Sequence, residues 1–241
     1  MPDNIINNIK NIIEKEPQLF LDYDGTLVPI VNDPSNCYAD NELLYILKKL
    51  NYYYETFIVT GRPLEDIIRF IGNYNIIALH GDIYFINNKK IKTPDFDKFV
   101  DICNDLYKHR SYYTDKFKNL RVYNKTGGLL FHLGNVKDVN ERNDIVKFVE
   151  DIADKNSMDV YNGINIVELR MPGINKGNSI KNIRNKNRPA IIIGDDITDE
   201  EAFYYNNDAV TIKVGNTKTI AKYRINYNDV RPLLLYLINL K

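Results

Sequence analysis

Two patterns of hydrophobic residues alternate along most of the chain. Short apolar runs, typical of buried strands, are followed by segments in which apolar residues recur every three or four positions, typical of amphipathic helices. The predicted strands cover residues 19–21, 55–59, 76–79, 190–193 and 209–214. The predicted helices cover residues 3–15, 40–50, 229–240 and a segment after Gly177 that ends near residue 184. This alternation predicts an α/β fold in which the strands form a parallel sheet.

The pattern changes near residue 83. The segments that follow predict a hairpin at 83–93, helices at 95–109 and 138–153, strands at 120–123 and 129–133, and strands at 158–161 and 165–170 joined by a turn at Asn162-Gly163. Strands joined by hairpins differ from the strand-helix alternation on either side. We therefore expect a mixed α/β cap domain at 83–165, inserted in a Rossmann-like parallel-sheet core formed by 1–82 and 166–241.

Two carboxylates follow the first predicted strand. Asp22 and Asp24 are two positions apart and precede Gly25, which permits a sharp turn. Residues two apart on an extended chain share a face, so these side chains would repel each other unless a cation lay between them. Mg²⁺ binds carboxylate and carbonyl oxygens and is commonly shared with a phosphate. The pair indicates a phosphoryl-transfer centre with an aspartate nucleophile, although an acidic turn or a fragment of a calcium loop remains an alternative.

A hydroxyl group and a glycine end the next predicted strand, in Thr60-Gly61-Arg62. A hydroxyl and free backbone N–H groups at the start of a helix can surround phosphate oxygens. The alternative is an ordinary helix cap, for which threonine is a common residue. A further acidic cluster, with Asp195, Asp196 and Asp199, follows the strand at 190–193. Ligands of open α/β sheets bind beyond the carboxyl ends of the strands, so Asp22, Thr60 and Asp195 are expected to converge in one crevice, with the cap lying over it.

Composition narrows the range of partners. The 241 residues include 32 Lys and Arg and 32 Asp and Glu, so the formal net charge is zero. This balance argues against binding to nucleic acid or to an anionic membrane. The two cysteines lie far apart, and no segment resembles a signal peptide or a membrane span. We expect a cytoplasmic protein, monomeric, that acts on a small molecule.

Four motifs carry a resemblance to a known superfamily. In chain order they are Asp22-Tyr23-Asp24-Gly25-Thr26-Leu27, Thr60-Gly61-Arg62, Lys176-Gly177 and Gly194-Asp195-Asp196-x-Thr198-Asp199-Glu200-x-x-Phe203. They resemble the motifs of the haloacid dehalogenase superfamily of phosphatases. The first and last motifs are most similar to those of the trehalose-6-phosphate phosphatase family, whose members carry a mixed α/β cap at the same insertion position.

The residue types of these motifs fit one reaction. Asp22 would attack phosphorus to form an aspartyl-phosphate, and Asp24 would act first as an acid and then as a base. Thr60 and Lys176 would hold the phosphoryl oxygens. The remaining motif residues expected to contact the substrate are Thr26, Gly61 and Arg62. The expected Mg²⁺ ligands and their supports are Asp22, the backbone carbonyl of Asp24, Asp195, Asp196 and Asp199, with Asp199 also a candidate helix cap.

The resemblance also implies a sugar site in the cap. Lys125, Glu168 and Arg170 resemble the residues with which the family holds the sugar, although Lys125 and Glu168 could instead form a structural ion pair. The chain has His132-Leu133-Gly134 where the family usually has His-Tyr-Arg. The predicted activity is Mg²⁺-dependent hydrolysis of trehalose 6-phosphate.

Other activities share part of this chemistry. The alternatives are a phosphatase of a sucrose-type or glucosylglycerol-type phosphate, a sugar phosphomutase and an inert sugar-phosphate sensor. A receiver domain also combines a phosphorylated aspartate with an acidic pair, a threonine and a lysine. Its motifs occur in a different order, however, because there the acidic pair precedes the phosphorylated aspartate.

Overall fold

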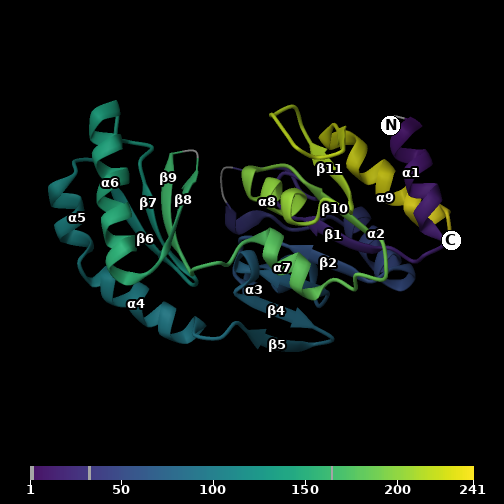
Figure 1. Cartoon of the computed structure of the whole chain (residues 1–241), viewed down its shortest axis with the longest axis horizontal. Helices are drawn as coiled ribbons and strands as arrows, with labels where there is room; N and C mark the ends of the chain where they lie inside the picture. The colour runs from purple at the N-terminus through teal and green to yellow at the C-terminus, as the bar shows by residue number, and fades with distance from the viewer. Residues whose placement is uncertain (1–2, 32–33, 164) are drawn as a thin grey trace. The chain divides into compact units, whose positions relative to one another are not determined.

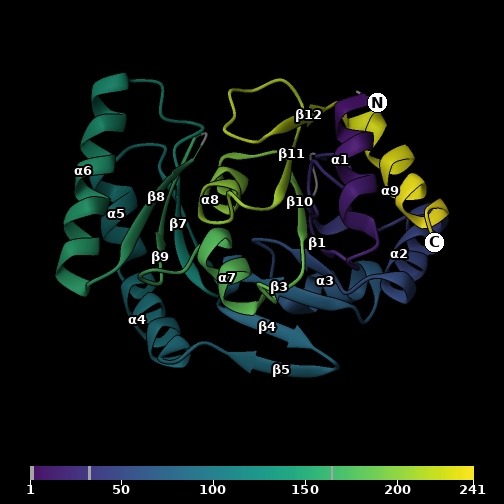
Figure 2. The same cartoon turned by 45° about the vertical axis from the view of Figure 1, so that its right-hand side comes forward.

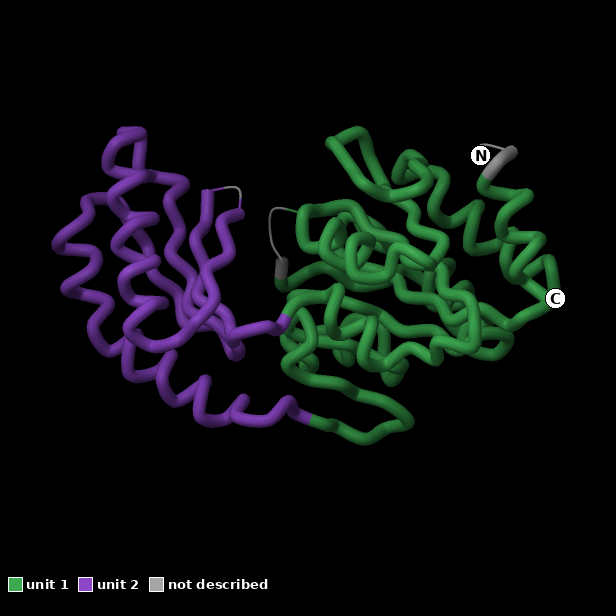
Figure 3. The backbone as a smooth tube through the Cα atoms, viewed as in Figure 1, with its two compact units in different colours: residues 1–91, 175–241 green, residues 92–174 purple. Residues whose placement is uncertain are grey.

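The computed structural model describes residues 3–31, 34–163 and 165–241. Within these residues the chain divides into two compact units, shown in different colours in Figure 3. Unit 1 comprises the chain up to Ile91 and from Asn175 to Lys241, and unit 2 comprises Lys92–Ile174. None of the helices in the described ranges combines the length and apolar character needed to cross a membrane.

A central sheet organises unit 1. In the described part of the chain it has eight strands in the order β12-β11-β10-β1-β2-β3-β4-β5. The strands are β1 (Gln18–Asp22), β2 (Thr56–Val59), β3 (Asn75–Ala78), β4 (Ile83–Ile86), β5 (Lys89–Lys92), β10 (Ala190–Gly194), β11 (Val210–Val214) and β12 (Tyr223–Ile225). Neighbours from β12 to β3 are parallel, and β4 runs antiparallel to β3. The predicted α/β fold with a parallel sheet is therefore confirmed.

Strand register brings the motif loops of unit 1 to one edge of this sheet. Asp22 at the end of β1 pairs with Val59 at the end of β2, and Leu21 pairs with Ile193 near the end of β10. Because these strands are parallel, the segments that follow them leave the sheet side by side. The first, second and fourth motifs thus meet at the carboxyl edge, as the sequence predicted.

Helices cover both faces of the sheet of unit 1 (Figures 1 and 2). They are α1 (Asp3–Ile13), α2 (Asn41–Tyr53), α3 (Leu64–Ile71), α7 (Lys176–Ile183), α8 (Ile197–Tyr205), α9 (Val230–Asn239) and the short 3₁₀ helices Pro34–Asn36, Leu79–Gly81 and Tyr227–Asp229. On one face, Phe20, Phe57 and Ile192 pack with Ile180 of α7 and Phe203 of α8. Helices α1, α2 and α9 lie on the opposite face (Figure 2). The packing of Ile180 and Phe203 against the sheet fixes α7 and α8, which carry the third and fourth motifs.

Unit 2 is a second α/β layer structure. As far as the chain is described, its sheet has four antiparallel strands in the order β6-β7-β9-β8. Its elements are α4 (Phe96–Lys108), α5 (Arg110–Lys116), β6 (Arg121–Lys125), β7 (Gly128–His132), α6 (Val139–Asn156), β8 (Asp159–Gly163) and β9 (Ile166–Arg170). Phe99, Phe131, Ile145, Val149 and Leu169 belong to one buried core. Unit 2 therefore has a core of its own.

The boundaries of the inserted segment differ from those predicted. We placed it at 83–165, whereas unit 2 spans Lys92–Ile174. The hairpin of β4 and β5 extends the sheet of unit 1 because β4 pairs with β3. Strand β9, which we assigned to the core, pairs with β7 and β8. Hydrophobic pattern alone shows that a strand exists but does not show which neighbour it pairs with.

Three smaller features also differ from the sequence predictions. Asn162 and Gly163, expected to form a turn, lie within β8, and the next residue, 164, is outside the described residues. The short elements α5 and β12 were not predicted.

Candidate active site

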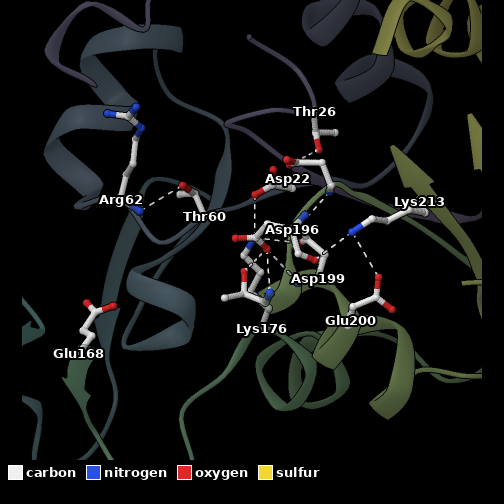
Figure 4. Close-up of polar contacts among 12 residues, drawn as sticks. Asp22, Thr26, Thr60, Arg62, Glu168, Lys176, Asp196, Asp199, Glu200 and Lys213 are labelled. Carbon is white, nitrogen blue, oxygen red and sulfur yellow. Dashed lines mark hydrogen bonds and ion pairs between the residues drawn. The ribbon is translucent and has the colours of Figure 1, made fainter. Parts of the chain in front are cut away.

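A buried lysine joins two carboxylates at the carboxyl edge of the unit 1 sheet (Figure 4). Lys176 begins α7, and the side chain of Asn175 caps this helix by accepting from the N–H of Asn178. The Nζ of Lys176 donates to Asp22 Oδ1 at 2.7 Å and to Asp199 Oδ1 at 2.8 Å. Although burial lowers the pKa of Lys176, the carboxylates of Asp199 and Asp22 raise it well above its ordinary value. Lys176 therefore stays protonated between these two acids.

Three carboxylates gather beside this lysine. Asp22, Asp195 and Asp199 each offer an oxygen, and these oxygens lie within 4.8 Å of one another. Burial and the neighbouring acids together raise the pKa of Asp22 to about 7 and that of Asp195 to about 6, although Lys176 acts in the opposite direction on both. The second oxygen of Asp22, Oδ2, is buried and has no hydrogen-bond partner among the described residues. Mg²⁺ binds oxygen ligands of this kind and would offset the repulsion, so these residues could hold it.

Backbone turns hold this cluster in place. Asp196, the residue before α8, accepts from the N–H groups of Thr198 at 2.8 Å and Asp199 at 3.2 Å. Asp199 in turn accepts from the N–H groups of Asp195 at 3.0 Å and Asp196 at 3.1 Å, which completes a capping box. A Cβ on Gly194 would lie 2.1 Å from Asp199 Cγ, so a side chain there would displace that carboxylate.

The capping arrangement corrects one prediction. We considered Asp199 as the helix cap, but Asp196 occupies the cap position and Asp199 lies three residues later. Burial raises the pKa of Asp196, but Lys176 and the hydrogen bond from Thr198 outweigh this effect and lower it to about 2. Asp196 is not part of the three-carboxylate group that the described residues form. Its carboxylate serves the helix terminus and lies 4.0 Å from the Lys176 ammonium.

The first motif packs directly on Asp195. Gly25 has a φ of 82°, and a Cβ there would lie 2.2 Å from Asp195 Oδ2. Both the left-handed backbone and this close approach require glycine. The hydroxyl of Thr26, which we predicted to contact the substrate, donates to Asp195 Oδ1 at 3.1 Å. In this structure Thr26 therefore orients a carboxylate of the acidic cluster.

Asp24 forms a two-contact ion pair with Arg62. Arg62 Nε lies 2.5 Å from Asp24 Oδ2, and Arg62 Nη2 lies 2.6 Å from Asp24 Oδ1. The same Nη2 donates to Cys37 Sγ at 2.9 Å. We predicted that Asp24 is the acid and base and that Arg62 contacts the substrate; the structure brings the two side chains together.

Thr60 and Gly61 form the turn after β2. Thr60 is buried, and its hydroxyl accepts from the N–H of Arg62 at 3.1 Å. Helix α3 begins at Leu64 with Pro63 at its cap position, so the alternative in which Thr60 is an ordinary helix cap does not hold. A Cβ on Gly61 would lie 2.4 Å from His80 Nε2, so a side chain at this position would have to displace the His80 ring.

The predicted sugar-binding residues form a charged cluster within unit 2. Glu168 on β9 is buried, with Oε1 3.2 Å from Lys125 Nζ and Oε2 3.0 Å from Arg170 Nη2. The Arg170 guanidinium lies 3.7 Å from the centroid of the Tyr161 ring. The ion pair that we considered as an alternative for Lys125 and Glu168 is thus present. Its presence does not exclude sugar binding, because Lys125 is 39% exposed.

Sequence reasoning assigned no role to Lys213 and Glu200, which lie beside the acidic cluster (Figure 4). Lys213 is a single charged side chain in the otherwise uncharged strand β11 (Val-Thr-Ile-Lys-Val). Glu200 follows Asp199 in the fourth motif. A charge in a fully buried strand was the signal that could have identified this position.

Comparison with known proteins relates these loops to a family. The sequence model of the Trehalose-phosphatase family matches residues 20–228. A trehalose-6-phosphate phosphatase-related protein of Thermoplasma acidophilum is 40% identical over 221 residues, which cover 91% of this chain and 96% of that protein. A bifunctional trehalose-6-phosphate synthase/phosphatase of Thermoproteus tenax is 29% identical over 234 residues, which cover 91% of this chain and 32% of that longer protein.

Solved structures agree with the sequence comparisons. A crystal structure of a trehalose-6-phosphate phosphatase related protein has a TM-score of 0.80 and 40% identity, and the match covers 92% of this chain and 97% of that one. A haloacid dehalogenase-like hydrolase from Bacteroides thetaiotaomicron shares the fold, with a TM-score of 0.63, 14% identity and coverage of 93% and 99%. With the family match extending through all four motifs, the chain belongs to the trehalose-phosphatase family and is a phosphoric monoester hydrolase.

Proposed function

We propose that this protein hydrolyses trehalose 6-phosphate to trehalose and phosphate through an aspartyl-phosphate on Asp22. The observation that supports this most strongly is the state of the Asp22 carboxylate. It is buried at the end of a central strand, one oxygen accepts from Lys176, and the other has no partner among the described residues. A carboxylate held in this way can direct its second oxygen at phosphorus.

In the proposed reaction, Asp22 Oδ2 attacks phosphorus while the bond between phosphorus and the sugar oxygen breaks. Asp24, after leaving its ion pair with Arg62 and taking a proton from solvent, gives that proton to the departing sugar oxygen, so the sugar leaves as a neutral alcohol. Asp24 then takes a proton from a water molecule that attacks the aspartyl-phosphate, which releases phosphate and regenerates Asp22. Lys176 and the Thr60 hydroxyl bind the phosphoryl oxygens, whose negative charge the lysine partly offsets.

Mg²⁺ fits the acidic cluster and, when bound, supplies positive charge that reduces the repulsion between Asp22 and the phosphate. We propose Asp22, Asp195 and the backbone carbonyl of Asp24 as its ligands, with Asp199 and Asp196 supporting them. The hydrogen bond from Thr26 would keep the Asp195 carboxylate oriented toward the cluster, and Gly25 leaves that carboxylate the space it occupies.

Removal of the metal should abolish activity. We expect phosphate release to stop in excess EDTA and to return when Mg²⁺ is added, because the carboxylates alone repel the substrate. Ca²⁺ should inhibit, since its larger and less regular coordination would misplace Asp22 relative to phosphorus. Titration of each ion against phosphate release measures both effects. Full activity in EDTA would contradict the proposed metal site.

The sugar is proposed to bind to the Lys125, Glu168 and Arg170 cluster of unit 2. Lys125→Ala and Glu168→Gln should each lower kcat/KM for trehalose 6-phosphate by about tenfold to a hundredfold, the value of a charged hydrogen bond. Hydrolysis of 4-nitrophenyl phosphate should persist, because this small substrate does not fill the sugar site. If both substrates lost activity together and the protein melted earlier, the cluster would be structural only.

The identity of the sugar can be tested by a phosphate-release screen. Phosphorylated mono- and disaccharides are supplied with Mg²⁺, and trehalose 6-phosphate should give the highest kcat/KM. The residues His132-Leu133-Gly134, where the family usually has His-Tyr-Arg, make a sucrose-type or glucosylglycerol-type phosphate the second candidate. A phosphomutase would instead isomerise the substrate and require an activating bisphosphate.

A further inference from the structure

A lysine in the sheet of unit 1 is buried although it does not belong to the proposed reaction. Lys213 lies on β11, and only 2% of its side chain is exposed. Burying an ammonium group is costly unless charged and polar partners replace water. Its partners are close: Nζ donates to the backbone carbonyl of Asp196 at 3.3 Å and lies 3.3 Å from Glu200 Oε1. The ammonium thus bridges the acidic loop and the first turn of α8 (Figure 4).

The strand register explains why this lysine reaches the acidic loop. Lys213 pairs with Gly194, the last residue of β10, and the loop 194–199 begins there. Neighbouring residues in a parallel sheet direct their side chains to the same face. The Lys213 side chain therefore runs beside the loop that carries Asp195 and Asp199. An apolar residue at this position would leave the Asp196 carbonyl without this donor.

Glu200 ties the same bridge to a second loop. Its Oε2 accepts from the Thr219 hydroxyl at 3.1 Å and from the N–H of Ile220 at 2.9 Å. Glu200 therefore links the loop between β11 and β12 to Lys213. Lys213 in turn links Glu200 to the backbone of Asp196. The charges of Lys213 and Glu200 balance each other, so the pair adds no net charge near the carboxylates.

We propose that Lys213 and Glu200 are positioning residues that hold the loop 194–199 in the conformation in which Asp195 binds the cation and Asp199 supports it. This inference rests on the proposed function, because the cation is the one proposed there. The side-chain partners given for Lys213 and Glu200 do not include a proposed cation ligand. The two residues act through the Asp196 backbone, which lies between Asp195 and the capped start of α8. Groups that orient metal ligands in this way typically change metal affinity by about 10–100-fold when removed.

The test is direct binding of Mg²⁺, measured by isothermal titration calorimetry without substrate. The double variant Lys213→Met/Glu200→Gln removes both charges and so keeps the net charge beside the cation constant. We expect its Kd for Mg²⁺ to rise by about tenfold. The Mg²⁺ concentration that gives half-maximal phosphate release should rise in parallel, while the rate at saturating Mg²⁺ should change by no more than about twofold.

Arg184→Met is the matched control. Arg184 is another buried cation of unit 1, 4% exposed, which donates to Asp208 Oδ1 at 2.9 Å and does not belong to the proposed reaction. The Arg184→Met variant should have a lower melting temperature and an unchanged Kd for Mg²⁺.

If the double variant fails to fold, Glu200→Gln supplies the test. Its Kd for Mg²⁺ is expected to rise by about threefold, because this substitution leaves the Lys213 ammonium partly unpaired.

A wild-type Kd in the variant that folds would overturn this inference alone, even if the variant melted earlier. Wild-type protein that bound no Mg²⁺ would overturn the proposed function as well. Calorimetry thus distinguishes a failure of the positioning role of Lys213 and Glu200 from a failure of the proposed function.

Discussion

Asp22→Asn is expected to reduce phosphate release by about 10⁵-fold, the size of effect that follows removal of an enzyme nucleophile. The amide has nearly the same shape as the carboxylate but cannot attack phosphorus, so the aspartyl-phosphate cannot form. The fold should persist, because Lys176 keeps its contact with Asp199 and a buried carboxylate is replaced by a neutral group. Single-turnover phosphate release and the melting temperature measure the two effects.

Asp208→Asn is the matched control for this change. It makes the same chemical substitution in unit 1 and also removes an ion pair, the one between Asp208 and Arg184. Its carboxylate is exposed and belongs to no part of the proposed reaction, so phosphate release should stay at the wild-type rate. Acid-quenched wild-type enzyme should show a phosphorylated peptide that contains Asp22, and the Asp22→Asn variant should show none. Near-normal release by Asp22→Asn would contradict the nucleophile assignment.

The convergence of the motif loops was predictable from the sequence because it depends on a simple property of parallel sheets. Asp22, Thr60 and Asp195 each follow a short apolar run, and the carboxyl ends of such strands share an edge. The structure confirms the parallel sheet, and the sequence comparisons confirm the family that the motifs resemble. The catalytic roles of these residues remain predictions, because geometry alone does not report a reaction.

The contacts among the site residues were less predictable, since spacing does not determine which partner a side chain selects. Asp196 and Asp199 could each have capped α8, and only the backbone conformation shows that Asp196 does so. Arg62 was expected to contact the substrate, yet its guanidinium matches the two oxygens of Asp24. Pairing across 38 residues of sequence is decided by tertiary structure, which local patterns do not encode.

The predicted boundaries of the inserted segment were wrong for a related reason. Strands β4 and β9 have the alternating or apolar patterns of ordinary strands, and both were expected as strands. Their hydrogen-bond partners decide the unit to which they belong. For β9 these are the preceding strand β8 and the strand β7, which is far away in sequence because α6 lies between them. Lys213 illustrates the opposite case, in which one charged residue in a buried strand marked a tertiary contact that the pattern could have revealed.

Asp24→Asn is expected to lower kcat/KM for trehalose 6-phosphate by about 10³-fold, the middle of the range for general acid catalysis. A sugar hydroxyl is a poor leaving group unless it receives a proton as it departs, and asparagine has no acidic proton to give. With 4-nitrophenyl phosphate the loss in the first step should be less than about tenfold, because the nitrophenolate departs without protonation. Parallel kinetics on the two substrates measure this difference.

The same carboxylate is also proposed to activate water in the second step, which gives the variant a further signature. If formation of the aspartyl-phosphate from 4-nitrophenyl phosphate remains fast while its hydrolysis is slow, a burst of nitrophenolate should precede a slower steady state. The Arg62 partner is lost in this variant, but the pair is partly exposed, with 15% and 32% of the two side chains accessible, so the fold should persist. Equal losses on both substrates without a burst would show that Asp24 only orients Arg62 and transfers no proton.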